Sequence, residues 1–263
     1  MENFAFKKAF GQNFLNDHNI ITNIVKGAGI KYNSLVIEIG PGSGALTKEL
    51  AKVAKNVLCY EIDLRLESIL DDNLVEFNNV DIIFDDFLKR DINEDIKKYD
   101  YDNIYVVANL PYYITTPIIE KIIASKIDFH SVTIMIQKEV GDRFCAKPGS
   151  KDYSSITVFL NYYYDLKKLF IVSRNAFVPK PNVDSIVISL ITKKERLFLK
   201  NEDLFFNLIR DSFRFKRKNL RNNLKSYNLT IIENVLSKYH FDLTVRAEQL
   251  SLSIFVDIAN SLS

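Results

Sequence analysis

The sequence has few of the residues on which several classes of protein depend. Its 263 residues include two cysteines, three histidines and no tryptophan. Cys59 and Cys145 are too few for a disulfide framework, and no cysteine and histidine residues cluster with the spacing of a metal site. No apolar run approaches the roughly 18 residues of a membrane span, and the N-terminus lacks the apolar core of a signal peptide. We therefore expect a soluble, cytoplasmic protein without a metal or a membrane anchor.

Charge is balanced overall but unevenly distributed. The formal net charge is only +2. Residues 61–102 contain fourteen acidic and five basic residues, whereas residues 214–225 contain six basic and no acidic ones. A basic run is often only a solvated helix face. Here the contrast with the acidic segment indicates a surface near the C-terminus that faces a polyanion.

Strand and helix patterns alternate through the first three quarters of the chain. This alternation is typical of a mainly parallel sheet covered by helices. The predicted strands span 35–39, 57–62, 80–84, 104–108, 132–136, 169–173 and 185–191, and the predicted helices span 19–28, 45–54, 64–70, 117–124 and 139–144. Residues 155–163 fit either a helix or a strand. The apolar spacing is helical after about residue 192, so we predict an α/β domain over 1–192 and a small helical domain over 193–263.

The segment Asn109-Leu110-Pro111-Tyr112 directly follows one of the predicted buried strands. An Asn at the carboxyl end of a strand faces the crevice where open α/β sheets bind ligands. Its side-chain oxygen and the carbonyl before the proline are two acceptors for the hydrogens of an amino group, and Tyr112 offers a face to a flat ring. Such a pair would favour a pyramidal, nucleophilic amine on a nucleobase. The alternative is a simple turn at the end of the strand.

A glycine-rich turn, residues 40–44, joins the first predicted strand to the next helix. Glycine allows positive φ and close approach of the backbone to a ligand. The turn differs from the dinucleotide fingerprint because its third glycine comes one residue early and Pro41 removes a donor. Glu38, just before the turn, is a candidate to bind the amino-acid end of a cofactor; the alternative is an ordinary paired strand residue.

Two further acidic residues lie at the carboxyl ends of the next predicted strands, Glu61 among the last residues of its strand and Asp86 just after the strand 80–84. Glu61 comes 21 residues after Gly40, a position from which a carboxylate can accept hydrogen bonds from ribose hydroxyls and would repel a ribose phosphate. Asp86 could accept a bond from an adenine amino group. The alternatives are a surface acid for Glu61 and a turn or helix-capping residue for Asp86.

The loop 177–185 contains two prolines and begins with Phe177. Flipped nucleobases are held between flat or apolar side chains. Phe177 could therefore cover the base on the face opposite Tyr112, although packing in the core is an equal alternative.

Taken together, these segments resemble the rRNA adenine dimethyltransferases that act on the small ribosomal subunit, the KsgA type. The resemblance covers nearly the whole chain, and its motifs are residues 11–15, 38–42, 109–114, 137–140, 177–185 and 246–251. It implies a class I S-adenosylmethionine-dependent methyltransferase fold, Rossmann-like with a seven-stranded sheet, and a helical C-terminal domain. The combination of motifs is far more specific than any one of them.

The resemblance also implies a function and a site. The cofactor would be S-adenosyl-L-methionine, lined by Asn13, Leu15, Glu38, Gly40, Gly42, Glu61, Asp86 and Asn109. Asn109, Leu110 and Tyr112 would hold the target amine, with Phe177 stacking nearby. The substrate would be two adjacent adenines in the loop near the 3′ end of 16S rRNA in the immature small subunit, which implies a role in ribosome biogenesis. Arg214, Arg217, Lys218 and Arg221 would contact RNA phosphates.

Two alternative functions stay open. One is a methylase of large-subunit rRNA of the Erm type, which shares the glycine turn and a similar Asn-x-Pro-Tyr motif. The other is a ribosome-assembly factor that binds RNA without catalysis. We expect a monomer, because the sequence contains no added dimerisation element. The sequence also departs from the family pattern, with Ser43 in place of Leu and Asp85 in place of Gly, and Asp85 adds charge near the expected adenine position.

Overall fold

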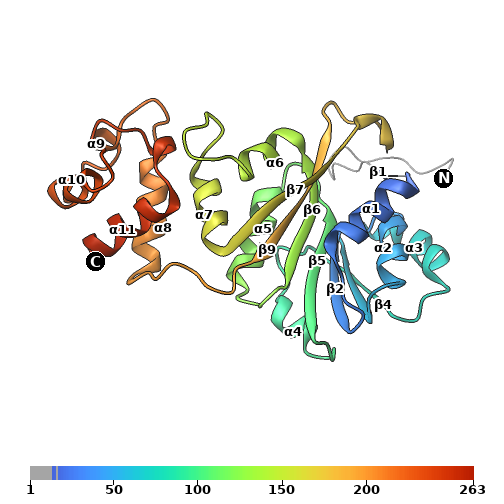
Figure 1. Cartoon of the computed structure of the whole chain (residues 1–263). Coiled ribbons are helices and arrows are strands. Elements are labelled where there is room, and N and C mark those ends of the chain that lie inside the picture. Colours follow the sequence, from blue (N-terminus) through green and yellow to red (C-terminus); the bar gives the residue numbers. More distant parts are fainter. Residues whose placement is uncertain (1–13, 16) are drawn as a thin grey trace. The chain divides into compact units, whose positions relative to one another are not determined.

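The computed structural model describes residues 14, 15 and 17–263, and Asn13 therefore lies outside the described part (Figure 1). The strands are β1 (Phe14–Leu15), β2 (Ser34–Ile39), β3 (Asn56–Glu61), β4 (Val80–Phe84), β5 (Asn103–Asn109), β6 (Ser131–Gln137), β7 (Tyr164–Val172), β8 (Phe177–Val178) and β9 (Ser185–Thr192). The helices are α1 (His18–Ala28), α2 (Ala45–Ala51), α3 (Glu67–Leu74), α4 (Ile92–Ile96), α5 (Thr115–Ala124), α6 (Lys138–Phe144), α7 (Ser155–Tyr163), α8 (Glu202–Ser212), α9 (Leu220–Asn223), α10 (Leu229–Ser237) and α11 (Leu252–Leu262).

Seven strands form one mixed sheet, which confirms the predicted seven-stranded α/β architecture. Their order is β4-β3-β2-β5-β6-β9-β7. Neighbours from β4 to β6 run parallel, and β9 runs antiparallel to β6. The chain order reverses between β2 and β5, and in open α/β sheets ligands bind at such a reversal, outside the carboxyl ends of the strands.

The central strands are apolar because both of their faces are covered. All six residues of β2 are buried, as are five of the six in β3. One face packs under α1 and α2, where Ile24 and Leu50 lie in the same apolar cluster as Val36 and Val57. Strands buried on both faces read as continuous apolar runs in the sequence. This explains why the predicted strand ranges agree with the observed ones to within one or two residues, except for the strand predicted over 169–173, which in the structure is the longer β7.

The chain divides into two compact units, and each has its own apolar core. The first comprises the residues up to Gly141 together with Lys167–Thr192, and the second comprises Asp142–Leu166 and Lys193–Ser263. The two units meet at three points along the chain, and the last of these lies after Thr192, where the sequence analysis placed its domain boundary. Residues 142–166, which the sequence analysis assigned to the first domain, group instead with the C-terminal helices.

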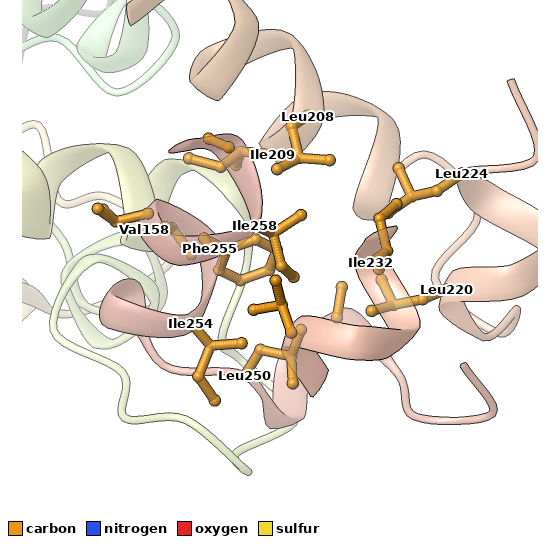
Figure 2. Packing of buried hydrophobic residues seen from close by; sticks show 14 of the residues in the cluster. Val158, Leu208, Ile209, Leu220, Leu224, Ile232, Leu250, Ile254, Phe255 and Ile258 are labelled. Carbon is orange, nitrogen blue, oxygen red and sulfur yellow. The ribbon is translucent and has the colours of Figure 1, made fainter. Parts of the chain in front are cut away.

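The core of the second unit explains this grouping. Val158 and Tyr162 of α7 are buried in one cluster with Phe205 of α8 and Phe255 of α11. Figure 2 shows Val158 beside the buried side chains of the C-terminal helices. The segment 155–163, which the sequence left open between helix and strand, is helical. The Ser154 and Thr157 side chains form a capping box at its start, which satisfies N–H groups that a helix otherwise leaves unpaired.

No helix in the described part of the chain is both long enough and apolar enough to cross a membrane.

Candidate active site

A cavity of about 130 Å³ lies at the carboxyl ends of β2, β3 and β5. Parallel strands end at the same edge of a sheet, so the residues that follow each strand come together there. The described site residues that line this cavity are Leu15, Glu38, Gly40, Gly42, Glu61, Asp86, Asn109, Leu110 and Tyr112. The structure therefore brings together predicted site residues that are up to 97 positions apart in the sequence.

The glycine turn and Glu61 are directly joined. The N–H of Gly42 donates to one carboxylate oxygen of Glu61 at 3.2 Å, and the N–H of Asp63 donates to the other at 2.9 Å. Gly42 has a φ of 61°, in the region that favours glycine. Glu61 is buried, and burial raises the pKa of its carboxyl group while these two N–H groups oppose the rise. The carboxylate is thus fixed at the end of β3.

Glu38 is the most deeply buried acid of the cavity, with 1% of its surface exposed. Burial raises the pKa of its carboxyl group to about 8. The thiol of Cys59, on the neighbouring strand β3, donates to the carboxyl group at 3.7 Å. A nearby cation favours the ionised form of a carboxyl group. We therefore expect Glu38 to lose its proton when a cation enters the cavity.

Asp85 and Asp86 follow β4 at the rim of the cavity. One oxygen of Asp86 accepts from the N–H of Leu88 at 3.0 Å, which fixes the side chain in its turn. Asp85 pairs with Arg90 at 3.6 Å, and Arg90 also pairs with Asp95. The extra negative charge that the sequence analysis noted at Asp85 therefore has a basic neighbour.

Asn109 ends β5, and the residues after it form a compact turn. The N–H of Leu110 donates to the carbonyl of Met135 on β6 at 3.1 Å, and the carbonyl of Pro111 accepts from Ile114 at 3.2 Å. Leu110 is buried. These bonds hold the segment rigidly at the edge of the cavity.

The ring of Tyr112 is held at its far end. Its hydroxyl lies 2.8 Å from the hydroxyl of Ser185, which is fully buried at the start of β9. Burial also raises the pKa of Tyr112, so the phenol stays neutral near pH 7. Ser185 was not predicted as a site residue, because it lies 73 positions after Tyr112 in the sequence. The pairing of β9 with β6 brings it to the site.

Phe177 does not line the cavity. It pairs through the backbone with Leu15 in the two-stranded β1–β8 sheet, and only 3% of its surface is exposed. Its side chain packs in the apolar cluster that also contains Leu15 and Val187. This position agrees with the alternative that Phe177 packs in the core. To stack on a base, the ring would have to leave this cluster.

The cavity has a one-sided charge. Its titratable lining includes the acids Glu38, Glu61, Asp85 and Asp86, and none of its lining residues in the described part of the chain is lysine, arginine or histidine. Tyr113, with 57% of its surface exposed, also lines the cavity and was not predicted as a site residue. Within the described residues, no group of three or more histidine, cysteine or acidic side chains is placed to hold a metal ion.

The predicted RNA-contacting residues lie in the second unit. Arg214, Arg217 and Lys218 are exposed in the loop between α8 and α9, and Arg221 lies in α9. Arg221 is 3.9 Å from Glu233. The basic run is therefore mainly a loop and not a helix face.

The strand order, with β9 antiparallel to β6, is that of a class I methyltransferase fold. The family model described as ribosomal RNA adenine dimethylase matches residues 3–263, and the chain belongs to this family. It is 46% identical to the ribosomal RNA small subunit methyltransferase A of Clostridium botulinum, over 98% of this chain and 94% of that protein. It is 45% identical to the protein of the same name from Anoxybacillus flavithermus, over 98% and 91%.

Solved structures agree with this assignment. A dimethyladenosine transferase from Plasmodium falciparum is 28% identical and superposes with a TM-score of 0.78, over 93% of this chain and 95% of that one. The 23S rRNA methyltransferase ErmE is 25% identical with a TM-score of 0.74, over 95% and 99%. The chain is thus more similar in sequence to the small-subunit enzymes above than to ErmE.

Proposed function

We propose that this protein transfers methyl groups from S-adenosyl-L-methionine to the exocyclic amines of two adjacent adenines near the 3′ end of 16S rRNA, during assembly of the small ribosomal subunit. Two findings support the choice of substrate: membership of the ribosomal RNA adenine dimethylase family and 46% identity to a small-subunit enzyme over nearly the whole chain.

The charge of the cavity carries the assignment of the cofactor. Its titratable lining is acidic, and none of the described lining residues is basic. Such a cavity suits a ligand with positive charge and no phosphate, because carboxylates attract cations and repel phosphates. S-adenosyl-L-methionine fits this description, and when bound it supplies a methyl group that its sulfonium has already activated for transfer.

Three acids would hold this cofactor, each at a different part of it. Glu61, fixed by the N–H groups of Gly42 and Asp63, is placed to accept hydrogen bonds from ribose hydroxyls. Glu38, buried beside the glycine turn, is placed to meet the ammonium group of the amino-acid end. Asp86, at the rim, is placed to accept a bond from the adenine amino group. Leu15 and Leu66 add apolar surface to the same cavity.

The target amine is assigned to Asn109 and Leu110. The side-chain oxygen of Asn109 and the carbonyl of Leu110 would accept one hydrogen each from the amine. The neighbouring carbonyl of Pro111 already accepts from Ile114, so it is less suited to this role. Two acceptors draw the amine toward a pyramidal geometry, in which the nitrogen lone pair is available for attack. Tyr112 would support the ring of the base.

No general base is required in this scheme. The amine becomes acidic once it has been methylated, and its proton can leave to water. The contribution of the protein is therefore positioning and electrostatics. This agrees with a cavity lining that contains no histidine among the described residues.

The decisive experiment is methyl transfer from labelled S-adenosyl-L-methionine to unmethylated small subunits and, in parallel, to large-subunit rRNA. Nucleoside mass spectrometry would identify the product. We expect dimethyladenosine in the small subunit alone. Dimethyladenosine in large-subunit RNA alone would assign the protein to the Erm type. Tight binding of small subunits without methylation of either RNA would indicate a non-catalytic assembly factor.

A further inference from the structure

The loop between α8 and α9, residues 213–219, combines positive charge with an exposed aromatic ring. We call it the α8–α9 loop. It contains Arg214, Lys216, Arg217 and Lys218 and no acidic residue. In the described part of the chain none of these four side chains forms an ion pair. Between them lies Phe215, with 57% of its surface exposed.

Phe215 and Phe198 are the two exposed phenylalanines in the described part of the second unit, and only Phe215 lies among basic side chains of the α8–α9 loop. The neighbouring phenylalanine, Phe213, packs on Tyr153 and Phe255 and contributes to the core of the second unit. Phe215 has no ring contact with another aromatic residue of the described chain, and the guanidinium of Arg214 lies 5.7 Å from its ring centre. Burial of a phenylalanine normally stabilises a protein, so the exposed ring of Phe215 adds little to the fold and is accessible to a ligand.

The loop is also held in a fixed shape. The side-chain amide of Asn223 donates to the carbonyl of Ser212 at 2.6 Å and lies within 3.4 Å and 3.5 Å of the carbonyls of Phe215 and Lys218. The N–H of Lys218 donates to the carbonyl of Phe215 at 2.9 Å. At the base of the loop, Tyr227 donates to Asp211 at 2.8 Å. A pre-ordered loop loses less conformational freedom when it binds.

An aromatic ring among basic side chains matches the chemistry of unpaired RNA. Bases in single-stranded segments stack on aromatic side chains, and lysine and arginine contact the adjacent phosphates. We propose that Phe215 is a base-stacking residue, which holds one unpaired rRNA base against the C-terminal unit while the basic side chains of the α8–α9 loop hold the backbone. This inference rests on the proposed function and adds a binding site separate from the methyl-transfer cavity.

The absence of tryptophan from the sequence allows a direct test. In a Phe215→Trp variant the new side chain is the only tryptophan, so its fluorescence reports on this position alone. We expect protein-free, unmethylated 16S rRNA to quench this fluorescence, because a stacked base quenches an indole. Unchanged emission at saturating rRNA would overturn the proposal. A blue shift with anionic lipid vesicles but no response to rRNA would also overturn it, in favour of a membrane-facing loop.

The contribution of base stacking to binding can be distinguished from that of phosphate contacts by measuring the affinity for unmethylated small subunits at several salt concentrations. The Phe215→Ala variant loses one stacking contact, so its affinity should fall about tenfold. Its salt dependence should not change, because no phosphate contact is lost. Phe215→Tyr should restore most of the affinity. Phe198→Ala is the matched control, because Phe198 lies in the same unit and is 76% exposed; its binding should equal that of the wild type.

Three results would contradict the stacking role: wild-type affinity in Phe215→Ala, an equal loss in Phe198→Ala, or a reduced salt dependence in Phe215→Ala. If the wild-type protein methylates small subunits and only these variants behave contrary to expectation, the inference fails and the proposed function stands. If the wild-type protein neither binds nor methylates small subunits, the proposed function itself fails.

Discussion

The hydroxyl groups of Tyr112 and Ser185 lie 2.8 Å apart, and Ser185 is fully buried. This contact joins the Asn109–Tyr112 segment after β5 to the start of β9, two strands away in the sheet. A tyrosine that is held at its hydroxyl has less freedom to rotate away from a bound base. The orientation of the ring is thus linked to the pairing of β9 with β6, where Ser185 lies opposite Gln137.

We predict that Tyr112→Phe and Ser185→Ala each lower kcat/KM for small subunits by a few-fold, since one hydrogen bond contributes about 0.5–1.5 kcal/mol. The double variant should be no worse than the more impaired single variant, because both changes remove the same contact. Tyr112→Ala, which also removes the ring, should lose about 1–3 kcal/mol of transition-state stabilisation. Additive losses in the double variant would show that the hydrogen bond does not position the ring.

We predict that Asn109→Ala abolishes methyl transfer and retains the fold, because it removes an acceptor for the target amine. The measurements are single-turnover methylation and thermal unfolding. Asn103→Ala is the matched control, since Asn103 begins the strand that Asn109 ends. Substantial methylation by Asn109→Ala would contradict the amine-holding role, and equal loss in Asn103→Ala would indicate damage to β5.

Glu38 should make the stability of the cofactor-free protein depend on pH. Its pKa is raised from 4.5 to about 8 in the folded protein, so between these values the folded state binds more protons than the unfolded state. The free energy of unfolding should therefore fall as pH rises through this range, by at most about 1.4 kcal/mol per pH unit for this one group. Glu38→Gln should flatten the dependence between pH 5 and 8.

Denaturant titrations of both proteins at several pH values would measure this difference. The matched control is Glu49→Gln, because Glu49 lies on α2 and does not line the cavity. If the free energy of unfolding of Glu38→Gln depended on pH as strongly as that of the wild type, Glu38 would not be the group responsible for the pH dependence. Cofactor binding should in turn release a proton near pH 7, because the cationic ligand favours ionised Glu38.

We predict that Glu61→Gln weakens cofactor binding about tenfold or more, since hydrogen bonds to a charged group contribute about 1.5–3 kcal/mol. Isothermal calorimetry with S-adenosyl-L-methionine would measure the effect. Glu67→Gln, an exposed acid at the start of α3, should bind normally. If Glu61→Gln bound the cofactor with wild-type affinity, the proposed contact between Glu61 and the ribose would be wrong.

Neutralising Arg217, Lys218 and Arg221 together should weaken binding of small subunits and reduce its dependence on salt. Each lost phosphate contact lowers the slope of log affinity against log salt by about 0.7–0.9. The effect of Arg221 should be the smallest, because Glu233 lies 3.9 Å from it. An unchanged slope in the triple variant would rule out phosphate contacts by this segment.

Local sequence patterns were enough to predict the α/β class and the candidate site residues at the strand ends. Central strands are buried on both faces, so they appear as apolar runs, and Glu61 and Asn109 follow two of these runs directly. Such local patterns survive in the sequence because each depends on neighbours only a few positions away. The glycine turn is visible for the same reason, since positive φ at Gly42 favours glycine regardless of distant contacts.

The contacts between residues far apart in the sequence depend on how the chain folds. The contact of Tyr112 with Ser185 depends on strand pairing across 73 positions, and the burial of Phe177 depends on its pairing with Leu15. The grouping of α7 with the C-terminal helices depends on the apolar face that α8 and α11 present to Val158. None of these contacts can be recognised from residues that are close together in the sequence. The polarity of a side chain indicates whether it is buried. Which residue it packs against depends on the path of the chain between the two residues.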